Sequence, residues 1–114
     1  IGAILYRRES NRMERIQAPK GGLTANSQSL TQVIISQILF QKGDRLLIAT
    51  DGITDQIGGV GIPRSFGFRR LQEAYLETMS LSAKQATEVI YGKFENWQGN
   101  NMRRDDTTLI CVDL

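Results

Sequence analysis

The sequence GDRLLIATDGITD occupies residues 43–55 and joins an apolar segment to an acidic, glycine-containing turn. A strand is predicted over 45–50, and its consecutive apolar residues Leu46–Ala49 lack the alternation of a half-exposed strand, which predicts burial on both faces. Asp51 and Gly52 follow directly, at a strand end where a rigid sheet can present a side chain to a site. Asp-Gly is also a common turn pair, so a simple tight turn is the alternative interpretation.

Strand signals dominate the chain on the amino-terminal side of this stretch. Residues 1–6 are apolar and β-prone, and residues 13–17 predict the return strand of a hairpin. Breaker residues and polar residues predict a loop over 18–29. Another strand is predicted over 33–40, and residues 41–44 suit a hairpin connection from it to the next strand.

Helical spacing dominates on the carboxy-terminal side, after a glycine-rich loop predicted over 51–61. A first helix is predicted from Phe66 onward. The second is marked by a capping box that pairs Ser82 with Gln85, and Gly99 is its expected stop. A closing strand follows at 107–112. Because strands and helices are segregated along the chain, the order predicts an α+β fold with mainly antiparallel pairing and two helices before the last strand.

The composition excludes several kinds of site. The 114 residues contain no histidine and one cysteine, Cys111, so histidine-based catalysis, histidine metal ligands and internal disulfides are excluded. Cys111 is expected in the core. A bound metal would have oxygen ligands, which favours Mg²⁺ or Mn²⁺.

The net charge and the hydropathy of the chain limit the kinds of partner that we expect it to bind. A net charge of +2 is too balanced to predict nucleic-acid or membrane-surface binding. No segment approaches the roughly 18 apolar residues that cross a membrane, and no secretory signal opens the sequence. We therefore expect a cytoplasmic protein that makes no membrane contact through this segment.

A second acidic site precedes the predicted closing strand, at Asp105 and Asp106. In an extended chain adjacent side chains point to opposite faces, so one carboxylate of the pair would face a given metal. The alternative interpretation is a charged loop in which Arg103 and Arg104 offset the two acids.

Three segments in this order resemble the SpoIIE-like protein phosphatases of the PPM group, which are metal-dependent and similar to protein phosphatase 2C. Residues 43–55 resemble the family segment GDxLLLxTDGxTE/D. The sequence FGFRRL at 66–71 is similar to its FGxxRL helix entry, and RDDTTLI at 104–110 to its DDxTLL strand. The extension DQIGG at 55–59 resembles a subgroup linked to bacterial regulatory pathways. The resemblance implies a β-sandwich flanked by helices that hydrolyses phosphoserine or phosphothreonine with two Mn²⁺ or Mg²⁺ ions.

The resemblance also assigns residues. It implies that Asp51 and Asp105 bind the catalytic metals and that Gly52 is the glycine accompanying the first of them. Asp55 falls near an additional metal position of some members, and Asp106 matches a supporting position. Residues 58–61 belong to a flap near the site in this interpretation.

Family members carry an earlier Asp-Gly pair with another metal-binding aspartate, and residues 1–50 contain no match to it. We therefore expect residues 1–114 to be the carboxy-terminal portion of a single domain, with an incomplete two-metal site. The implied substrate is a phosphorylated STAS-type anti-sigma-factor antagonist in a bacterial partner-switching pathway. An exposed half-sandwich would favour self-association.

Two other interpretations remain open. In one, the chain is a non-catalytic interaction module on a phosphatase-like scaffold. In the other, it is an unrelated α+β interaction domain whose acidic pairs are turns. The hairpin arginines Arg7, Arg8, Arg12 and Arg15 are interpreted as solvated residues rather than a phosphate-binding patch.

Overall fold

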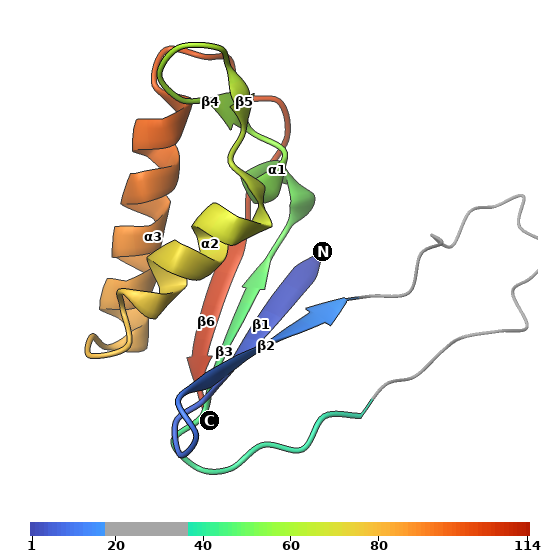
Figure 1. Ribbon diagram of the computed structural model, residues 1–114, viewed down its shortest axis with the longest axis vertical. Coiled ribbons are helices and arrows are strands. Elements are labelled where there is room, and N and C mark those ends of the chain that lie inside the picture. The colour runs from blue at the N-terminus through green and yellow to red at the C-terminus, as the bar shows by residue number, and fades with distance from the viewer. Residues whose placement is uncertain (18–36) are drawn as a thin grey trace, which may run out of the picture.

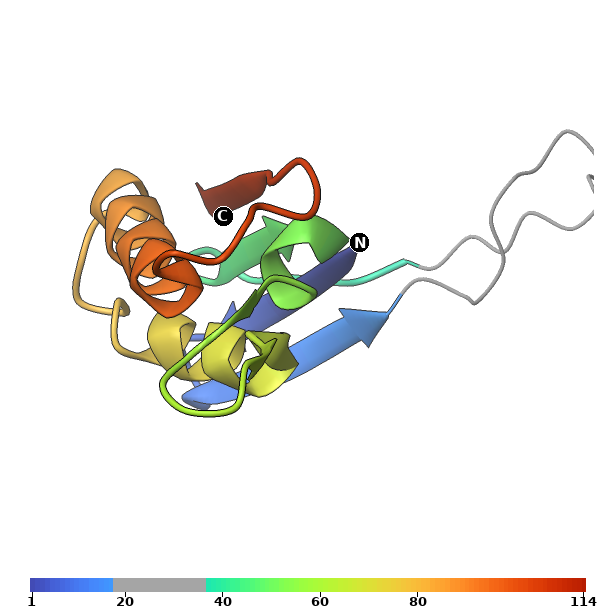
Figure 2. The same cartoon turned by 90° about the horizontal axis from the view of Figure 1, so that it is seen from above.

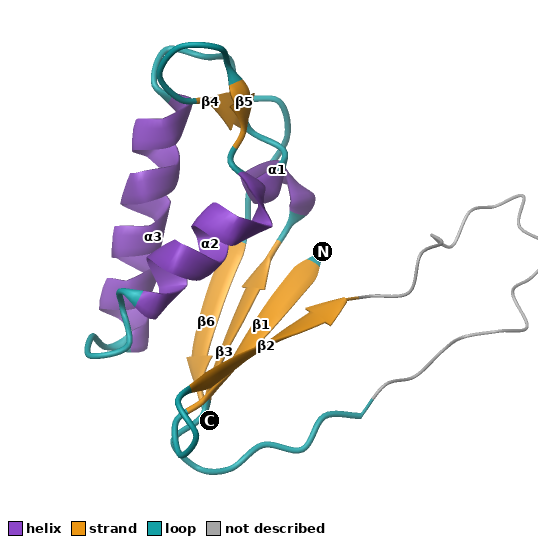
Figure 3. Cartoon of the chain, in the orientation of Figure 1, coloured by secondary structure: helices purple, strands orange, loops and turns teal. Residues whose placement is uncertain are grey.

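The computed structural model of the chain describes residues 1–17 and 37–114. A four-stranded antiparallel sheet, two larger helices and a small hairpin make up the described part (Figures 1 and 3). The elements in chain order are β1 (Gly2–Arg7), β2 (Arg12–Gln17), β3 (Arg45–Ala49), α1 (Asp51–Thr54), β4 (Ile57–Gly58), β5 (Arg64–Ser65), α2 (Gly67–Leu76), α3 (Ala83–Gln98) and β6 (Leu109–Asp113).

The strand order β2-β1-β3-β6 makes β3 and β6 neighbours, and their pairing places the two predicted acidic segments at the same end of the sheet. β3 and β6 are antiparallel, and Ala49 at the end of β3 pairs with Leu109 at the start of β6. The chain therefore leaves β3 toward Asp51 at the place where it enters β6 from Asp105. This arrangement follows from the antiparallel pairing that the sequence predicted.

Helices α2 and α3 lie on the same side of the sheet (Figure 2). The core between the layers contains buried side chains from both: Ile4, Tyr6, Leu47 and Ala49 from the strands, and Leu71, Ala74, Tyr75, Ile90 and Phe94 from the helices. Cys111 contacts this core, and burial raises the pKa of its thiol, as expected for a core cysteine and not for a nucleophile.

The prediction that β3 is buried on both faces was wrong. Leu47 and Ala49 are buried against the helices, whereas Leu46 and Ile48 are half-buried on the opposite face. Their neighbours on that face are apolar as well, because Leu46 pairs with Val112 and Ile48 with Ile110. A continuous apolar run in the sequence therefore reflects an apolar outer face of the sheet, over which no described helix lies.

The helix signals were confirmed. Ser82 Oγ accepts a hydrogen bond from Gln85 N at 3.1 Å, and Gln85 Oε1 accepts one from Ser82 N at 3.2 Å, which completes the capping box. Gly99 ends α3 with a φ of 54°. In the described ranges, no helix has the length and apolar character to span a membrane.

Two strand and loop predictions need correction. Residues 37–40 form no strand, and the rest of the predicted strand over 33–40 lies outside the described residues, as does the predicted loop over 18–29. Residues 41–44 do form a turn, but the strand that follows pairs with β1 and β6. Hairpin signals are local, and the long-range pairing with β1 determines the partner of β3.

The expected loop over 51–61 also contains regular structure. Its first residues form the single turn of α1, and Ile57–Gly58 forms β4, which pairs with β5. The segment therefore holds a helical turn and one arm of a small hairpin, which places the predicted flap beside the carboxy-terminal end of α3 (Figure 1).

Candidate functional site

The ends of β3 and β6 are joined beyond the sheet by the two threonines next to the acidic segments. Thr50 N donates to the carbonyl oxygen of Thr108 at 3.1 Å, and Thr108 N donates to Thr50 Oγ1 at 2.9 Å. Asp51 follows Thr50 directly. The hydroxyl of Thr50 thus extends the pairing to the residues that carry the candidate ligands.

Gly52 brings the two acidic segments into contact. A Cβ atom on this buried residue would lie 2.0 Å from the carbonyl oxygen of Asp106 and 3.3 Å from Thr107 Cγ2. The contact is with backbone, which cannot swing away as the end of a side chain can. Asp51 and Gly52 lie in the first turn of α1 rather than in a tight reverse turn. The glycine is therefore required by close approach of the second segment.

Asp51 presents an exposed carboxylate just beyond the end of β3. Its Oδ1 accepts a hydrogen bond from the terminal ammonium group of Ile1 at 2.9 Å. The residue lines a cavity of about 370 Å³ together with Asp55, Ser65 and Arg15.

Asp105 lies on a second, neighbouring hollow. Its Oδ1 accepts a hydrogen bond from Asp106 N at 2.7 Å, which holds the carboxylate next to its own backbone. The hollow, of about 430 Å³, is also lined by Asp55 and Ser65. Because these two residues line both cavities, Asp55 lies between the sites of Asp51 and Asp105.

The donor chemistry suits a hard cation, since carboxylate oxygens are preferred by Mg²⁺ and Mn²⁺. Within residues 1–17 and 37–114, however, no three side chains of histidine, cysteine, aspartate or glutamate come close enough to hold a metal ion. Asp51, Asp55 and Asp105 therefore line adjoining cavities without forming a three-ligand centre. Asp106 contributes its carbonyl to the contact with Gly52, and its side chain is exposed.

Arg103 fastens the second acidic segment to α3. Its Nη1 donates to Tyr91 Oη at 3.0 Å and to Thr107 Oγ1 at 3.2 Å, and its Nε donates to Gln98 Oε1 at 2.8 Å. The hydrogen bond with Thr107, followed by that from Arg103, lowers the pKa of Tyr91.

No ion pair between described residues joins Arg103 or Arg104 to Asp105 or Asp106. The interpretation of residues 103–106 as a charged loop therefore stays open, without a direct ion pair between its arginines and its acids. Its arginines and acids serve different contacts, and the two carboxylates remain exposed.

Trp97 at the end of α3 holds both arms of the β4–β5 hairpin. Gly59 N donates to the carbonyl oxygen of Trp97 at 2.8 Å, and Trp97 Nε1 donates to that of Arg64 at 3.1 Å. A Cβ atom on Gly58 would lie 1.9 Å from the Trp97 carbonyl oxygen. The predicted flap is thus anchored at its base, while its tip residue Val60 is 97% exposed.

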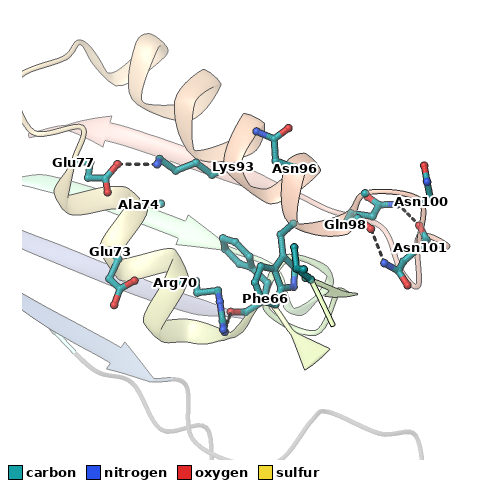
Figure 4. A pocket seen from close by; sticks show the side chains of 14 residues that line it. Phe66, Arg70, Glu73, Ala74, Glu77, Lys93, Asn96, Gln98, Asn100 and Asn101 are labelled. Atoms are coloured by element: carbon teal, nitrogen blue, oxygen red, sulfur yellow. Dashed lines mark hydrogen bonds and ion pairs between the residues drawn. The ribbon is translucent and has the colours of Figure 1, made fainter. Parts of the chain in front are cut away.

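A larger groove of about 760 Å³ lies between α2 and α3 (Figure 4). The guanidinium of Arg70 lies 4.0 Å from the centre of the Trp97 ring, and Lys93 Nζ forms an ion pair with Glu77 Oε2 at 2.8 Å. None of the aspartates at the ends of β3 and β6 lines this groove. Size alone would favour it, but the chemistry that the sequence predicted lies in the smaller cavities.

Two residues near the site were missed or interpreted differently from the sequence. Arg15 was interpreted as solvated, yet its guanidinium lies 3.7 Å from the centre of the Phe68 ring and lines the same cavity as Asp51. Gln56 was noted only as part of the DQIGG extension, yet it is completely buried and bonded to the second acidic segment. Its position directly after Asp55 was the one available signal.

Comparison with known proteins gives a family and a fold. The sequence profile of Stage II sporulation protein E (SpoIIE) matches residues 3–114. The structure is similar to the SiaA-PP2C domain of Pseudomonas aeruginosa, with a TM-score of 0.80 and 16% sequence identity over 99% of this chain and 43% of that one. The chain thus spans less than half the length of that structure. A search of curated proteins found no match.

Proposed function

The chain belongs to the SpoIIE family of PPM-type, protein phosphatase 2C-like domains, and from this premise we propose that it takes part in hydrolysing phosphoserine or phosphothreonine on a protein. The observation that carries the proposal is the contact of Gly52 with the Asp106 carbonyl. That contact joins the two segments whose aspartates resemble the family's metal ligands. If the two acidic segments were independent turns in an unrelated domain, close contact between them would not be expected.

In this proposal Asp51 and Asp105 are the metal ligands, and Asp55 lies between them on the wall shared by their cavities. Asp106 has a supporting role through its backbone. When bound, Mn²⁺ or Mg²⁺ would supply an activated water and neutralise charge on the phosphoryl oxygens. The residues of this chain hold the two carboxylates next to the paired ends of β3 and β6, where they are exposed to a substrate in solution.

We further propose that residues 1–114 are the carboxy-terminal portion of one phosphatase domain. The match to 43% of the SiaA-PP2C chain supports this, because the remainder of that chain has no counterpart here. Another acid from outside these residues would complete the metal site. The apolar outer face of the sheet is available for a further layer or for a second copy.

The substrate we propose is a phosphorylated STAS-type anti-sigma-factor antagonist in a bacterial partner-switching pathway, which also implies a cytoplasmic location. Support comes from the family membership and from the DQIGG extension at residues 55–59. The arms of the β4–β5 hairpin line the cavity of Asp105 through Ile57 and Ser65, and its exposed tip at Val60 offers such a protein a contact outside that cavity.

A Mn²⁺-dependent phosphatase assay tests the function. It compares residues 1–114 with the domain extended at its amino end, each with an Asp51→Ala variant. We expect little activity from residues 1–114, clear activity from the extended domain, and loss of that activity in Asp51→Ala. Activity of the extended domain that survives the substitution would rule out the metal-ligand role of Asp51.

The same assay separates the alternative, a non-catalytic interaction module on this scaffold. If the extended domain folds, binds the phosphorylated partner and releases no phosphate at saturating Mn²⁺, the interaction module is the correct interpretation. Binding is measured by calorimetry with phosphorylated and unphosphorylated partner, so that recognition of the phosphate is scored separately from its hydrolysis.

A further inference from the structure

Gln56 is a buried amide whose side chain joins segments far apart in the sequence. It is 0% exposed. Its Nε2 donates to the carbonyl oxygens of Ile57 at 3.0 Å and Met102 at 2.9 Å, and its Oε1 accepts from Arg104 N at 3.3 Å. Both the amino group and the oxygen of the amide therefore have partners, as buried polar groups require.

The segments that this side chain joins are the two acidic ones. Gln56 directly follows Asp55 in the turn after α1, and Arg104 directly precedes Asp105. The backbone of Gln56 is fixed as well, because its carbonyl oxygen accepts a hydrogen bond from Phe66 N at 2.8 Å, next to the start of α2. The amide is thus a rigid point from which the second segment is held.

The second acidic segment depends on side-chain hydrogen bonds to fix its position. Residues 99–108 contain no helix or strand, and Met102 is 86% exposed, so apolar burial does little to fix it. Arg103 ties the segment to α3. Gln56 ties the residues on either side of Arg103, namely Met102 and Arg104, to the turn after α1. These two sets of contacts hold neighbouring residues to two different parts of the fold.

We propose that Gln56 is a positioning residue that sets the place of Asp105 relative to Asp51 at the phosphatase site. The inference rests on the proposed function, and it assigns Gln56 no contact with metal or substrate. Hydrogen bonds behind a metal ligand typically contribute about 10–100-fold in metal affinity or activity. Gln56 acts on the backbone beside Asp105 rather than on its carboxylate, and we expect an effect within the same range.

The amide cannot be replaced without loss, because it donates two hydrogen bonds and accepts one. Gln56→Met keeps the length of the side chain and removes all three. The matched control is Thr78→Val, because Thr78 is also 0% exposed and its Oγ1 donates to the carbonyl oxygen of Tyr75 at 2.6 Å, in the connection between α2 and α3.

Hydrogen exchange in the metal-free, full-length protein gives the first readout. In Gln56→Met we expect the hydrogen-bonded amides of the second acidic segment, those of Arg104 and Asp106, to exchange about tenfold faster, as for the loss of one or two net hydrogen bonds. Thr78→Val should leave these amides unchanged. Equal protection of these two amides in wild type and Gln56→Met would overturn the inference.

The Mn²⁺ concentration that gives half-maximal phosphatase activity is the second readout. We expect Gln56→Met to raise it about 10–100-fold and Thr78→Val to leave it at the wild-type value. Faster exchange with an unchanged Mn²⁺ requirement would overturn the positioning role and leave a structural one. The proposed function fails separately, in the wild-type background, if activity survives Asp51→Ala.

Discussion

The carbonyl oxygen of Asp106 occupies the space that a side chain on Gly52 would need, 2.0 Å from the ideal Cβ position. The φ angle of Gly52 is not in the left-handed region, so conformational freedom does not explain this glycine. It is explained by the crossing of two segments that lie more than fifty residues apart in the sequence. A side chain at this position must push the acidic segment that precedes β6 away from α1.

Gly52→Ala should therefore destabilise the fold and weaken the site together. Forcing a methyl group into a filled site costs about 1–3 kcal/mol, and the displaced backbone carries Asp106. Urea unfolding measures the free-energy change, and Mn²⁺-dependent phosphatase activity of the extended domain measures the site. The control is Gly92→Ala in α3, where a Cβ meets nothing within 4 Å. That change should stabilise by about 0.5–1 kcal/mol, and equal effects of the two would contradict the explanation.

Arg45 ties the sheet to the connection between α2 and α3. The buried guanidinium donates to the carbonyl oxygens of Thr78 at 3.0 Å and Leu81 at 2.6 Å and to Asp113 Oδ1 at 2.6 Å. Arg45→Met would remove the Arg45 donor from the Leu81 carbonyl and the cation from Asp113, while the Thr78 carbonyl would keep only its hydrogen bond from Leu81 N. We expect a loss on the order of 3 kcal/mol in urea unfolding. Arg69→Met, which removes an exposed partner of Glu73, should change stability by less than about 0.5 kcal/mol.

The carboxylate of Asp44 makes stability depend on pH in the acid range. Hydrogen bonds from Gln41 N at 2.8 Å and Arg8 N at 3.1 Å, with the nearby Arg7, lower its pKa. The stabilisation is fully present above the unfolded-state pKa of about 3.9. It is lost as the pH falls through the lower folded-state value.

Asp44→Asn should remove this part of the pH dependence. We expect the urea midpoint of the wild type to fall more steeply below about pH 4 than that of the variant. Glu9→Gln, in the exposed turn between β1 and β2, is the control for loss of a carboxylate and should keep the wild-type slope. Parallel curves for wild type and Asp44→Asn would show that Asp44 does not contribute.

The apolar outer face of the sheet predicts self-association of residues 1–114. Ile110 and Val112 are 46% and 38% exposed on this face, beside Ile48 and Leu46. Sedimentation should show a concentration-dependent oligomer that the double variant Ile110→Thr with Val112→Thr shifts toward monomer. Threonine keeps a high strand propensity, so the fold should persist. Val60→Thr, at the exposed hairpin tip, should have no effect, and a wild type that stays monomeric would count against the prediction.

Local signals in the sequence predicted the elements whose causes are local. The Ser82–Gln85 capping box and Gly99 fixed the limits of α3, and the antiparallel order placed the two acidic segments at strand ends. The partner of β3 was missed because a strand carries no local mark of its long-range neighbour. Its apolar run was also misjudged, since Leu46 and Ile48 face outward in an apolar layer rather than into the core.

The residues of the candidate site also separate into those that the sequence could predict and those that depend on long-range contacts. Acids at strand ends are visible in a sequence, and the resemblance to the SpoIIE-like phosphatases nominated Asp51 and Asp105 among them. The close approach at Gly52 and the three hydrogen bonds of Gln56 were not visible there, since both depend on where an irregular segment crosses a turn. No sequence spacing marks a buried glutamine whose side chain forms hydrogen bonds to several segments.

The double attachment of the β4–β5 hairpin to Trp97 has a consequence for how such domains diverge. Because the arms are fastened at Gly59 and Arg64, the residues between them can change in sequence or length without disturbing α3 or the acidic edge. Under the proposed function, exchanging this tip between relatives would change the surface offered to a partner protein and leave Asp51, Asp55 and Asp105 unchanged.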